Sequence, residues 1–432
     1  MLALIDGRDS SAPVPIPRPE AVRGREPLED VHAIVQEVRL RGDAALLEFT
    51  RRFDRAHLDE ASLRVDESTI AKARKLVRPE LIDALEVMKE RLTSTHERQL
   101  RSSWLDRRPD ELVGELIRPV RRAGVYVPGG RASYPSTVIM GAVPARVAGV
   151  EGIAVASPPD ARGEIAEPVL AACAVAGVTE VYRMGGAQAI AALAAGTQTV
   201  RPVDKIVGPG NIYVTLAKRL VQNLVGIDTE AGPTEIAVIA DSSVPPDVIA
   251  ADLIAQAEHG PHGAHALITW EPDLAETVMV MIERQLTMHA RGEDVENALI
   301  EGGSAVLVRD RAHALATANA FAPEHLELAF DGAEDVLDDV RNAGAVFIGP
   351  WSPVPVGDYV AGTNHVLPSG GSARWASGLT AGDFMKSIYV SGLERSALER
   401  LAPHVYALAE AEGLSAHGRA VRTRLDLPEV MP

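Results

Sequence analysis

The chain has 432 residues, of which 46% are hydrophobic, and its formal net charge is −17 at pH 7. This length exceeds what one hydrophobic core usually serves, and the composition is that of a globular rather than a disordered protein. The negative charge argues against nucleic acids and anionic membranes as partners, because both are bound through basic surface.

The ends and the cysteine content point to a cytoplasmic protein. MLALIDGRDSS reaches Asp6 and Arg8 before any apolar segment is built, so we expect no signal peptide. No stretch approaches the ~18 uninterrupted apolar residues that a membrane span requires. The single cysteine, Cys173, excludes an intramolecular disulfide, which fits a reducing compartment.

The first hundred residues divide into an arm and a helical region. Residues 1–26 contain several prolines and charges and predict an extended arm. From Pro27 to about Leu100, apolar and charged residues alternate at helical spacing, as in VHAIVQEVRLRGDAALLEFTRRF. This second region is therefore predicted to be mostly helix.

After Gly124, short β-branched runs alternate with alanine-rich helical patterns. The runs expected to be buried strands are GVYV, GIAVAS, EVYRM, KIVG, EIAVIAD, ALITW, SAVLVRD and AVFIG. Such alternation predicts right-handed βαβ units and largely parallel sheets. These strands exceed what one nucleotide-binding half needs, so we expect two α/β domains that meet near residue ~234. A final helix is predicted from roughly Leu393 to Glu412.

Three glycine turns follow predicted strands: VPGGRAS, RMGGAQA and VGPGNIY. Glycine allows close backbone approach to a ligand, and a helix that begins after each turn would offer free N–H groups to an anion. None matches the dinucleotide fingerprint, and ordinary βα turns are an equal alternative. Tyr126, Gln188 and Asn211 lie beside the turns and favour a shared ligand crevice.

Four separated residues have the chemistry of a divalent metal site. Gln256 and His259 are three residues apart in a predicted helix and share one of its faces. Asp358 lies in a predicted glycine-rich loop, and His417 follows a helix end. Zinc accepts such nitrogen and oxygen donors. The alternatives are a solvated amide, a helix-end histidine, a plain loop and a helix cap.

Glu324 and His325 form an acid/base pair in FAPEHLEL. We expect them on or near a helix that begins at His313 and is interrupted by Pro323. Adjacent residues on a helix do not face each other, so the two side chains would address different sides of one substrate. A purely structural Glu-His pair is the alternative.

Taken in order, these motifs resemble those of histidinol dehydrogenase. The motifs that carry the resemblance are GVYVPGG, RMGGAQA, VGPGN, DTEAGPTE, AQAEH, FAPEHLE, GDYVAGTNHVLP and EGLSAHG. They extend from about residue 30 to residue 420 with their spacing intact, which makes the match highly specific.

With the strand pattern, the resemblance predicts two incomplete Rossmann-like domains with parallel-sheet cores in an intertwined homodimer that shares its active sites. Residues 27–124 and 235–375 are expected to form the domain that carries the zinc and acid/base residues. Residues 125–234 are expected to form the NAD-binding domain. Residues 1–26 are the arm, and residues 376–432 a helical tail that reaches the partner subunit.

The resemblance also implies a role for each candidate residue. The implied zinc ligands are Gln256, His259, Asp358 and, from the partner subunit, His417. The implied acid/base pair is Glu324 and His325. Thr234, His325, His365 and Glu412, with the zinc ligands, would contact the substrate, and Tyr126, Gln188 and Asn211 would contact NAD. Thr234 stands where many family members have serine and keeps the hydroxyl.

The implied reaction is the last step of histidine biosynthesis, a four-electron oxidation of L-histidinol through L-histidinaldehyde to L-histidine that reduces two NAD⁺. His325 suits the role of general base. Cys173 lies in an apolar helix pattern without a basic neighbour, so water activated by Glu324 is the expected nucleophile. Zinc would position the amino-imidazole end of the substrate. The alternatives are an enzyme for another small polar alcohol and a non-catalytic protein with structural zinc.

Overall fold

A computed structural model describes residues 2–19, 27–129, 133–229, 232–289 and 291–427. Its contacts divide the chain into two units, the first comprising Met1–Gln99 and Val120–Phe384 and the second Leu100–Pro119 and Met385–Pro432. None of the helices in these ranges is long and apolar enough to cross a membrane. Part of the first predicted glycine turn, residues 130–132, lies outside the described residues.

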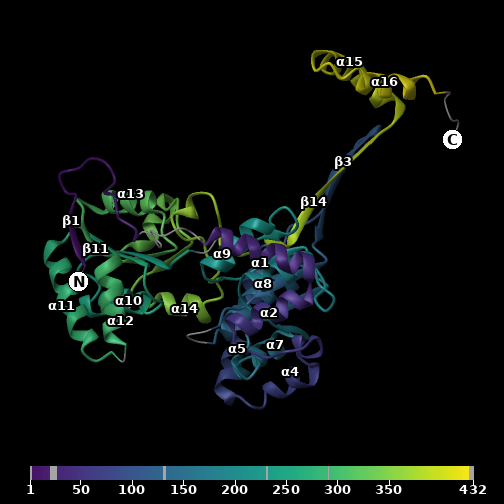
Figure 1. The fold of residues 1–432 in the computed structure, drawn as a ribbon. Helices are drawn as coiled ribbons and strands as arrows, with labels where there is room; N and C mark the ends of the chain where they lie inside the picture. Colours follow the sequence, from purple (N-terminus) through teal and green to yellow (C-terminus); the bar gives the residue numbers. More distant parts are fainter. Residues whose placement is uncertain (1, 20–26, 130–132, 230–231, 290, 428–432) are drawn as a thin grey trace. The chain divides into compact units, whose positions relative to one another are not determined.

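One parallel sheet of the first unit is built mainly from residues 235–348 (Figure 1). Its strands lie in the order β1 (Ala3–Asp6), β11 (Gly303–Leu307), β10 (Ala264–Thr269), β9 (Glu235–Ala240), β12 (His325–Ala329) and β13 (Ala345–Ile348). All neighbouring strands pair in parallel. Counted from β9, the order is third, second, first, fourth, fifth, which is the Rossmann order without its last strand. The N-terminal arm adds β1 at one edge.

A second parallel sheet in the same unit has the same order. Its strands are β6 (Glu180–Arg183), β5 (Gly152–Ser157), β4 (Arg122–Tyr126), β7 (Lys205–Val207) and β8 (Gly226–Ile227). They too pair in parallel. The direction of winding reverses between β4 and β7, which creates a topological switch point. The two sheets confirm the predicted pair of incomplete Rossmann-like folds with parallel-sheet cores, and they contain all the β-branched runs that were expected to be strands.

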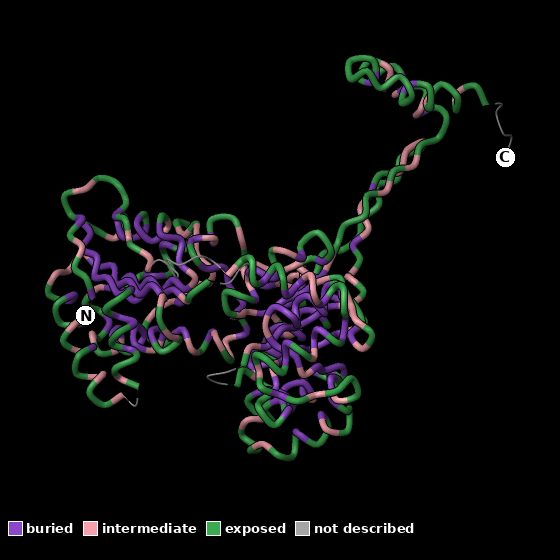
Figure 2. The backbone as a smooth tube through the Cα atoms, in the orientation of Figure 1, coloured by how far each residue is buried: buried purple, intermediate pink, exposed green. Residues whose placement is uncertain are grey.

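Helices cover both faces of each sheet, and Figure 2 shows the strands as largely buried. On the β9 sheet, α10 (Pro246–Ala257), α11 (Pro272–Leu286), α12 (Gly292–Gly302) and α14 (Val354–Tyr359) pack on one face, and α13 (Arg311–Phe321) and η1 (Ala333–Asp339) on the other. The helices that flank the β4 sheet are α6 (Pro135–Val147), α7 (Glu167–Ala176), α8 (Gly186–Ala195) and α9 (Ile212–Val221). The short 3₁₀ helices η2 (Ser372–Arg374) and η3 (Ala381–Phe384) come after α14 in the chain. Continuous apolar strands are expected where both faces are covered.

The N-terminal helices pack with the β4 sheet, which differs from the predicted grouping of residues 27–124 with residues 235–375. These helices are α1 (Leu28–Arg41), α2 (Asp43–Phe53), α3 (Glu60–Leu63), α4 (Glu67–Ala73) and α5 (Pro79–Glu97). Val31 and Leu46 belong to the same apolar cluster as Tyr126 and Leu193. An amphipathic pattern tells which face of a helix is buried but not against which sheet, and this explains the difference.

The second unit is an antiparallel ribbon with two helices. β14 (Met385–Leu393) pairs with β3 (Glu111–Pro119) along its whole length, and β2 (Trp104–Arg107) pairs with the other edge of β3. α15 (Arg395–Ala411) and α16 (Ser415–Leu425) follow β14. The predicted final helix is confirmed as α15, but the sequence analysis missed the ribbon. Its strands β2 and β14 are mostly exposed, and β3 between them is mostly half-buried (Figure 2).

Three local predictions around the candidate residues are wrong. The helix expected to carry the acid/base pair ends at Phe321, and His325 is instead the first residue of strand β12. Ala322 adopts φ 52° in the left-handed region, which together with Pro323 ends the helix. Asp358 was expected in a loop but lies in α14. His259 lies just beyond the end of α10 rather than on its face.

The packing of the N-terminal helices can be tested with Leu46→Ala. Leu46 is fully buried against the β4 sheet, so its truncation should lower the free energy of unfolding by roughly 2–4 kcal/mol. Amide hydrogen exchange should quicken in β4, β5 and β7. If the loss of protection fell instead on β9, β10 and β12, the observed grouping would be wrong.

Candidate active site

A cavity of about 470 Å³ lies in the first unit where the two sheets face each other. It meets the carboxyl ends of β4 and β7 but the amino ends of β9 and β12. Among the predicted site residues, those that line it are Asn211, Thr234, His259, Glu324, His325, Asp358 and His365. Residues separated by more than 150 positions are thus brought to one site. The usual rule that ligands bind at the carboxyl ends of parallel strands holds for only one of the two sheets.

Three imidazoles in this cavity are oriented by backbone carbonyl groups. The Nδ1 atoms of His259, His325 and His365 lie 3.2, 2.8 and 3.0 Å from the carbonyl oxygens of Gln256, Glu235 and Asp358, respectively. A carbonyl oxygen can only accept, so each Nδ1 carries the hydrogen. The Nε2 lone pair of each ring is therefore available to bind a proton or a metal ion.

Glu324 is held by a relay of hydrogen bonds. Its Oε2 accepts from the Thr234 hydroxyl at 3.0 Å and from the Glu235 backbone N–H at 2.9 Å. The Gln256 side-chain amide in turn donates to the Thr234 hydroxyl oxygen. The Thr234 hydroxyl thus links two of the candidate residues, a role that serine could also fill.

Burial shifts the pKa values of the titratable side chains in the site so that their uncharged forms are favoured. Desolvation raises the pKa of Glu324 to about 8, although the hydrogen bonds from Glu235 and Thr234 oppose this shift. It lowers the pKa of His325, and it lowers that of His365 to about 4. Desolvation also raises the pKa of Asp358, against the attraction of His325 and His259. Near neutral pH the imidazoles of His325 and His365 are therefore uncharged bases.

The donor set fits the chemistry of a zinc ion, although only in part. His259 presents a free Nε2, Asp358 a carboxylate and Gln256 an amide oxygen that is not engaged by Thr234. In the part of the chain that the structure describes, no group of three or more His, Cys, Asp or Glu side chains could hold a metal ion. Within the first unit, the candidate zinc donors are thus His259, Asp358 and the Gln256 amide oxygen. A further donor is needed to complete a zinc site.

The residues predicted to contact NAD have different environments. Asn211 lines the cavity, and its side chain also caps α9 by accepting from the backbone N–H groups of Tyr213 and Val214. The Tyr126 hydroxyl accepts from the backbone N–H of Gly186 at 3.0 Å and is buried. Gln188 is buried in α8. Neither of these two residues lines this cavity, and Tyr126 binds the backbone of the second glycine turn.

Glu412 and His417 belong to the second unit. Glu412 follows α15, and His417 lies in the first turns of α16. Both side chains are exposed there.

Sequence reasoning missed two features of the site. Tyr134 and Tyr359 line the cavity, and the only local signal was that Tyr359 follows Asp358. Arg18 of the N-terminal arm donates to both carboxylate oxygens of Glu235, at 2.5 and 3.1 Å, and to the Phe321 carbonyl. No pattern in the sequence links positions so far apart. The arm thus neutralises a buried carboxylate beside Thr234.

Comparisons with known proteins identify relatives over most of the chain. A family model described as histidinol dehydrogenase matches residues 18–425. The chain belongs to the histidinol dehydrogenase family. A histidinol dehydrogenase of Synechococcus is 48% identical over 94% of this chain and 93% of its own length. One from Geobacter metallireducens is 49% identical over 93% and 92%, respectively.

A solved histidinol dehydrogenase structure supports the same assignment. The crystal structure of the Elizabethkingia anophelis protein superposes with a TM-score of 0.90 at 34% identity and covers 98% of both chains. Members of this family are thus similar to the chain over nearly its whole length, which includes the second unit.

The raised pKa of Glu324 predicts a pH-dependent stability. A carboxyl group whose pKa rises from 4.5 to about 8 on folding contributes stability that is complete below pH 4.5 and lost as the pH rises through 8. In metal-free protein, Glu324→Gln should therefore be more resistant to urea than the wild type at pH 8, by roughly 4 kcal/mol. The difference should disappear at pH 4. An equal difference at both pH values would contradict the assigned burial.

Proposed function

We propose that the chain is a cytoplasmic, zinc- and NAD-dependent enzyme that oxidises L-histidinol through L-histidinaldehyde to L-histidine, the last step of histidine biosynthesis. One observation carries the proposal. The cavity brings the uncharged base His325 and the carboxyl group of Glu324 together with metal donors His259 and Asp358. Family membership gives the substrate, because the relatives are named histidinol dehydrogenases.

His325 serves as the base in the first oxidation. Its Nε2 accepts the proton of the substrate hydroxyl as the carbon loses hydride. The bond from Nδ1 to the Glu235 carbonyl keeps the ring in the tautomer that this step needs. The positive charge that forms on the ring is favoured by Asp358, whose Oδ1 lies 3.9 Å from Nε2. When bound, NAD⁺ is the hydride acceptor and zinc holds the amino-imidazole end of the substrate.

Glu324 acts in the second oxidation, which requires an oxygen nucleophile. Its carboxylate takes a proton from water, the oxygen adds to the aldehyde carbon, and His325 again accepts a hydroxyl proton as hydride leaves. Cys173 is buried in α7, where burial raises the pKa of its thiol far above the usual range, so it is not a thiolate nucleophile. The whole reaction consumes histidinol, water and two NAD⁺ and yields histidine, two NADH and protons.

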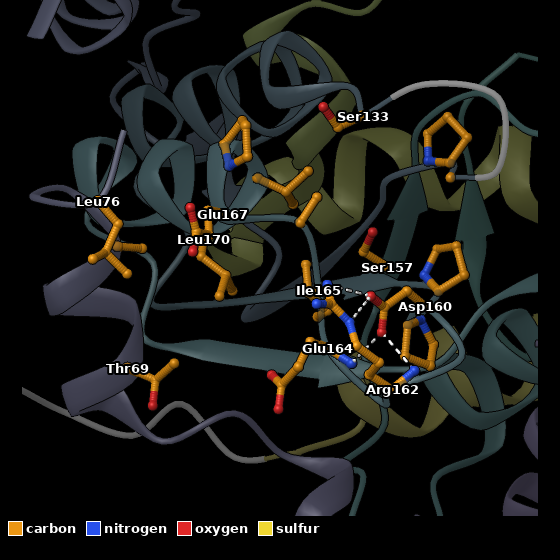
Figure 3. Close-up of a pocket in the computed structure, with 18 residues that line it drawn as sticks. Thr69, Leu76, Ser133, Ser157, Asp160, Arg162, Glu164, Ile165, Glu167 and Leu170 are labelled. Atoms are coloured by element: carbon orange, nitrogen blue, oxygen red, sulfur yellow. Dashed lines mark hydrogen bonds and ion pairs between the residues drawn. The ribbon is translucent and has the colours of Figure 1, made fainter. Parts of the chain in front are cut away.

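We place the dinucleotide along the carboxyl ends of the β4 sheet. Pro128 and Gly129 border both the active-site cavity and a larger one of about 910 Å³. The larger cavity follows β5, with Ser157 and Asp160 among its lining residues (Figure 3). A cofactor whose nicotinamide lies near Asn211 would extend its adenosine half in this direction, as the strand order favours.

The second unit supports a dimer that shares its active sites. Trp104, Tyr389 and Leu408 are large apolar side chains that are 49, 84 and 64% exposed in this unit. A thin ribbon with such a surface is marginally stable by itself in water. A second copy of the chain would cover it and supply His417 as the missing zinc ligand and Glu412 as a substrate contact.

Glu324→Gln tests the division of labour between the two oxidations. The wild type should form two NADH per histidinol and much less with other amino alcohols. The variant should oxidise added histidinaldehyde roughly 100-fold more slowly, because a neutral amide cannot accept a proton from water. Oxidation of histidinol to the aldehyde should slow only a few-fold, as measured by single-turnover NADH formation. Equal slowing of both steps would show that Glu324 does not activate water.

Mixed dimers test whether His417 acts in the partner's site. His259→Asn and His417→Asn should each lose zinc and activity, as measured by metal analysis and NADH formation. After the two variants are refolded together, one intact site in each mixed dimer should restore about a quarter of the wild-type activity. His404→Asn, an exposed change on α15, is the matched control and should stay active. If mixing restored nothing, His417 would not complete the partner's site.

A further inference from the structure

A buried ion pair holds the third glycine turn, Gly208–Asn211. Lys218 of α9 lies 2.6 Å from Asp228, which follows β8, and their side chains are only 4 and 3% exposed. The Gly208 backbone N–H donates to Asp228 Oδ2 at 2.6 Å, and Lys218 Nζ donates to the Gly208 carbonyl oxygen. Both backbone polar groups of Gly208 are therefore bound by this one ion pair.

Side-chain packing cannot hold the turn in place at Gly208, because this residue has no side chain. This residue adopts φ +115°, and a Cβ atom there would lie 2.1 Å from the Tyr126 carbonyl oxygen. Gly208 thus lies directly against the end of β4, at the topological switch point of the sheet. The position of Gly208 therefore depends on the groups that bind its backbone.

Beyond Gly208 the turn forms part of the active-site cavity. Pro209, Gly210 and Asn211 line the cavity, and Asn211 caps the first turn of α9. Lys218 lies on the same helix, so the ion pair fixes the turn and the helix start as one body. Burying two opposite charges is rarely more stabilising than burying apolar side chains of similar size. A positional role explains the presence of charges here better than a gain in stability does.

We propose that Lys218 and Asp228 are positioning residues for the cofactor, which hold the backbone of Gly208–Asn211 where a dinucleotide contacts it. This inference rests on the proposed NAD-dependent function. Neither residue lines the active-site cavity. Their effect therefore passes through the turn, and it concerns NAD rather than histidinol.

The test compares Lys218→Met, Asp228→Asn and the double variant Lys218→Met/Asp228→Leu. The double variant leaves no unpaired charge, so it keeps the fold even where a single change does not, but it leaves the Gly208 backbone unbound. In each folded variant the KM for NAD should rise about tenfold or more. Residues that orient the ligands of a metal ion, without touching the ion, have effects of this size on its binding. The KM for histidinol should stay within about twofold of the wild type, and kcat within about threefold.

A second ion pair at the opposite end of the same sheet provides the matched control. Arg122 donates to both carboxylate oxygens of Glu180, at 3.2 and 2.7 Å, between the amino ends of β4 and β6. Both side chains are mostly buried. Glu180→Gln should lower the midpoint of thermal unfolding and leave the KM for NAD unchanged.

A measurement without the cofactor separates the possible outcomes. In NAD-free protein, amide exchange at Gly208 and Asn211 should quicken in the Lys218 and Asp228 variants and not in Glu180→Gln. Equilibrium titration with NAD should show weaker binding by the same variants. If they bound NAD as tightly as the wild type, the inference would be overturned while the proposed function stood. If the wild type itself bound no NAD, the proposed function would fail, and this inference with it.

Discussion

The chemistry of the site depends on hydrogen bonds from imidazole Nδ1 atoms to backbone carbonyl groups. The carbonyls of Glu235, Gln256 and Asp358 each bind one ring, so a rigid backbone rather than a mobile side chain selects the tautomer. The three rings line one cavity, and each keeps an Nε2 lone pair that can accept a proton or a metal ion. In the proposed reaction, one of these rings binds the metal ion and another accepts the proton of the substrate hydroxyl. A change in the backbone at the start of β9 would disturb the base more than the loss of a distant side chain.

The two parallel sheets have the same strand order, but they border the cavity with opposite ends of their strands. The β4 sheet presents its carboxyl ends, where glycine turns allow close approach of a cofactor. The β9 sheet presents its amino ends, where Thr234, Glu324 and His325 precede or begin strands. Thr234, Glu324 and His325 therefore lie opposite the glycine turns across one cavity. Arg18 of the N-terminal arm neutralises the Glu235 carboxylate next to these groups.

The sequence was sufficient for the regular parts of this arrangement and insufficient for its long-range contacts. Continuous β-branched runs predicted the parallel strands, because strands buried on both faces need no polar residues. The same reasoning failed at β12, where His325 and Glu327 interrupt the apolar pattern while Leu326 and Leu328 pack on the opposite face. Residue chemistry singled out most of the candidate residues, whereas their roles, and Thr234, His365 and Glu412, came only from the family's motifs. Their grouping in one cavity could not be derived from spacing. The partners of the N-terminal helices and the Lys218–Asp228 pair depend on tertiary packing alone.

The most direct test of the account is the anomalous scattering of a crystal grown with zinc and histidinol and measured above the zinc absorption edge. One peak is expected in each cavity, bonded to His259 Nε2 and to Asp358. Gln256 and the second copy's His417 should complete the set, with the nitrogens of histidinol beside it. A histidinol-bound cavity without a peak, or a peak outside it, would contradict the proposed role of the metal in holding the substrate against His325.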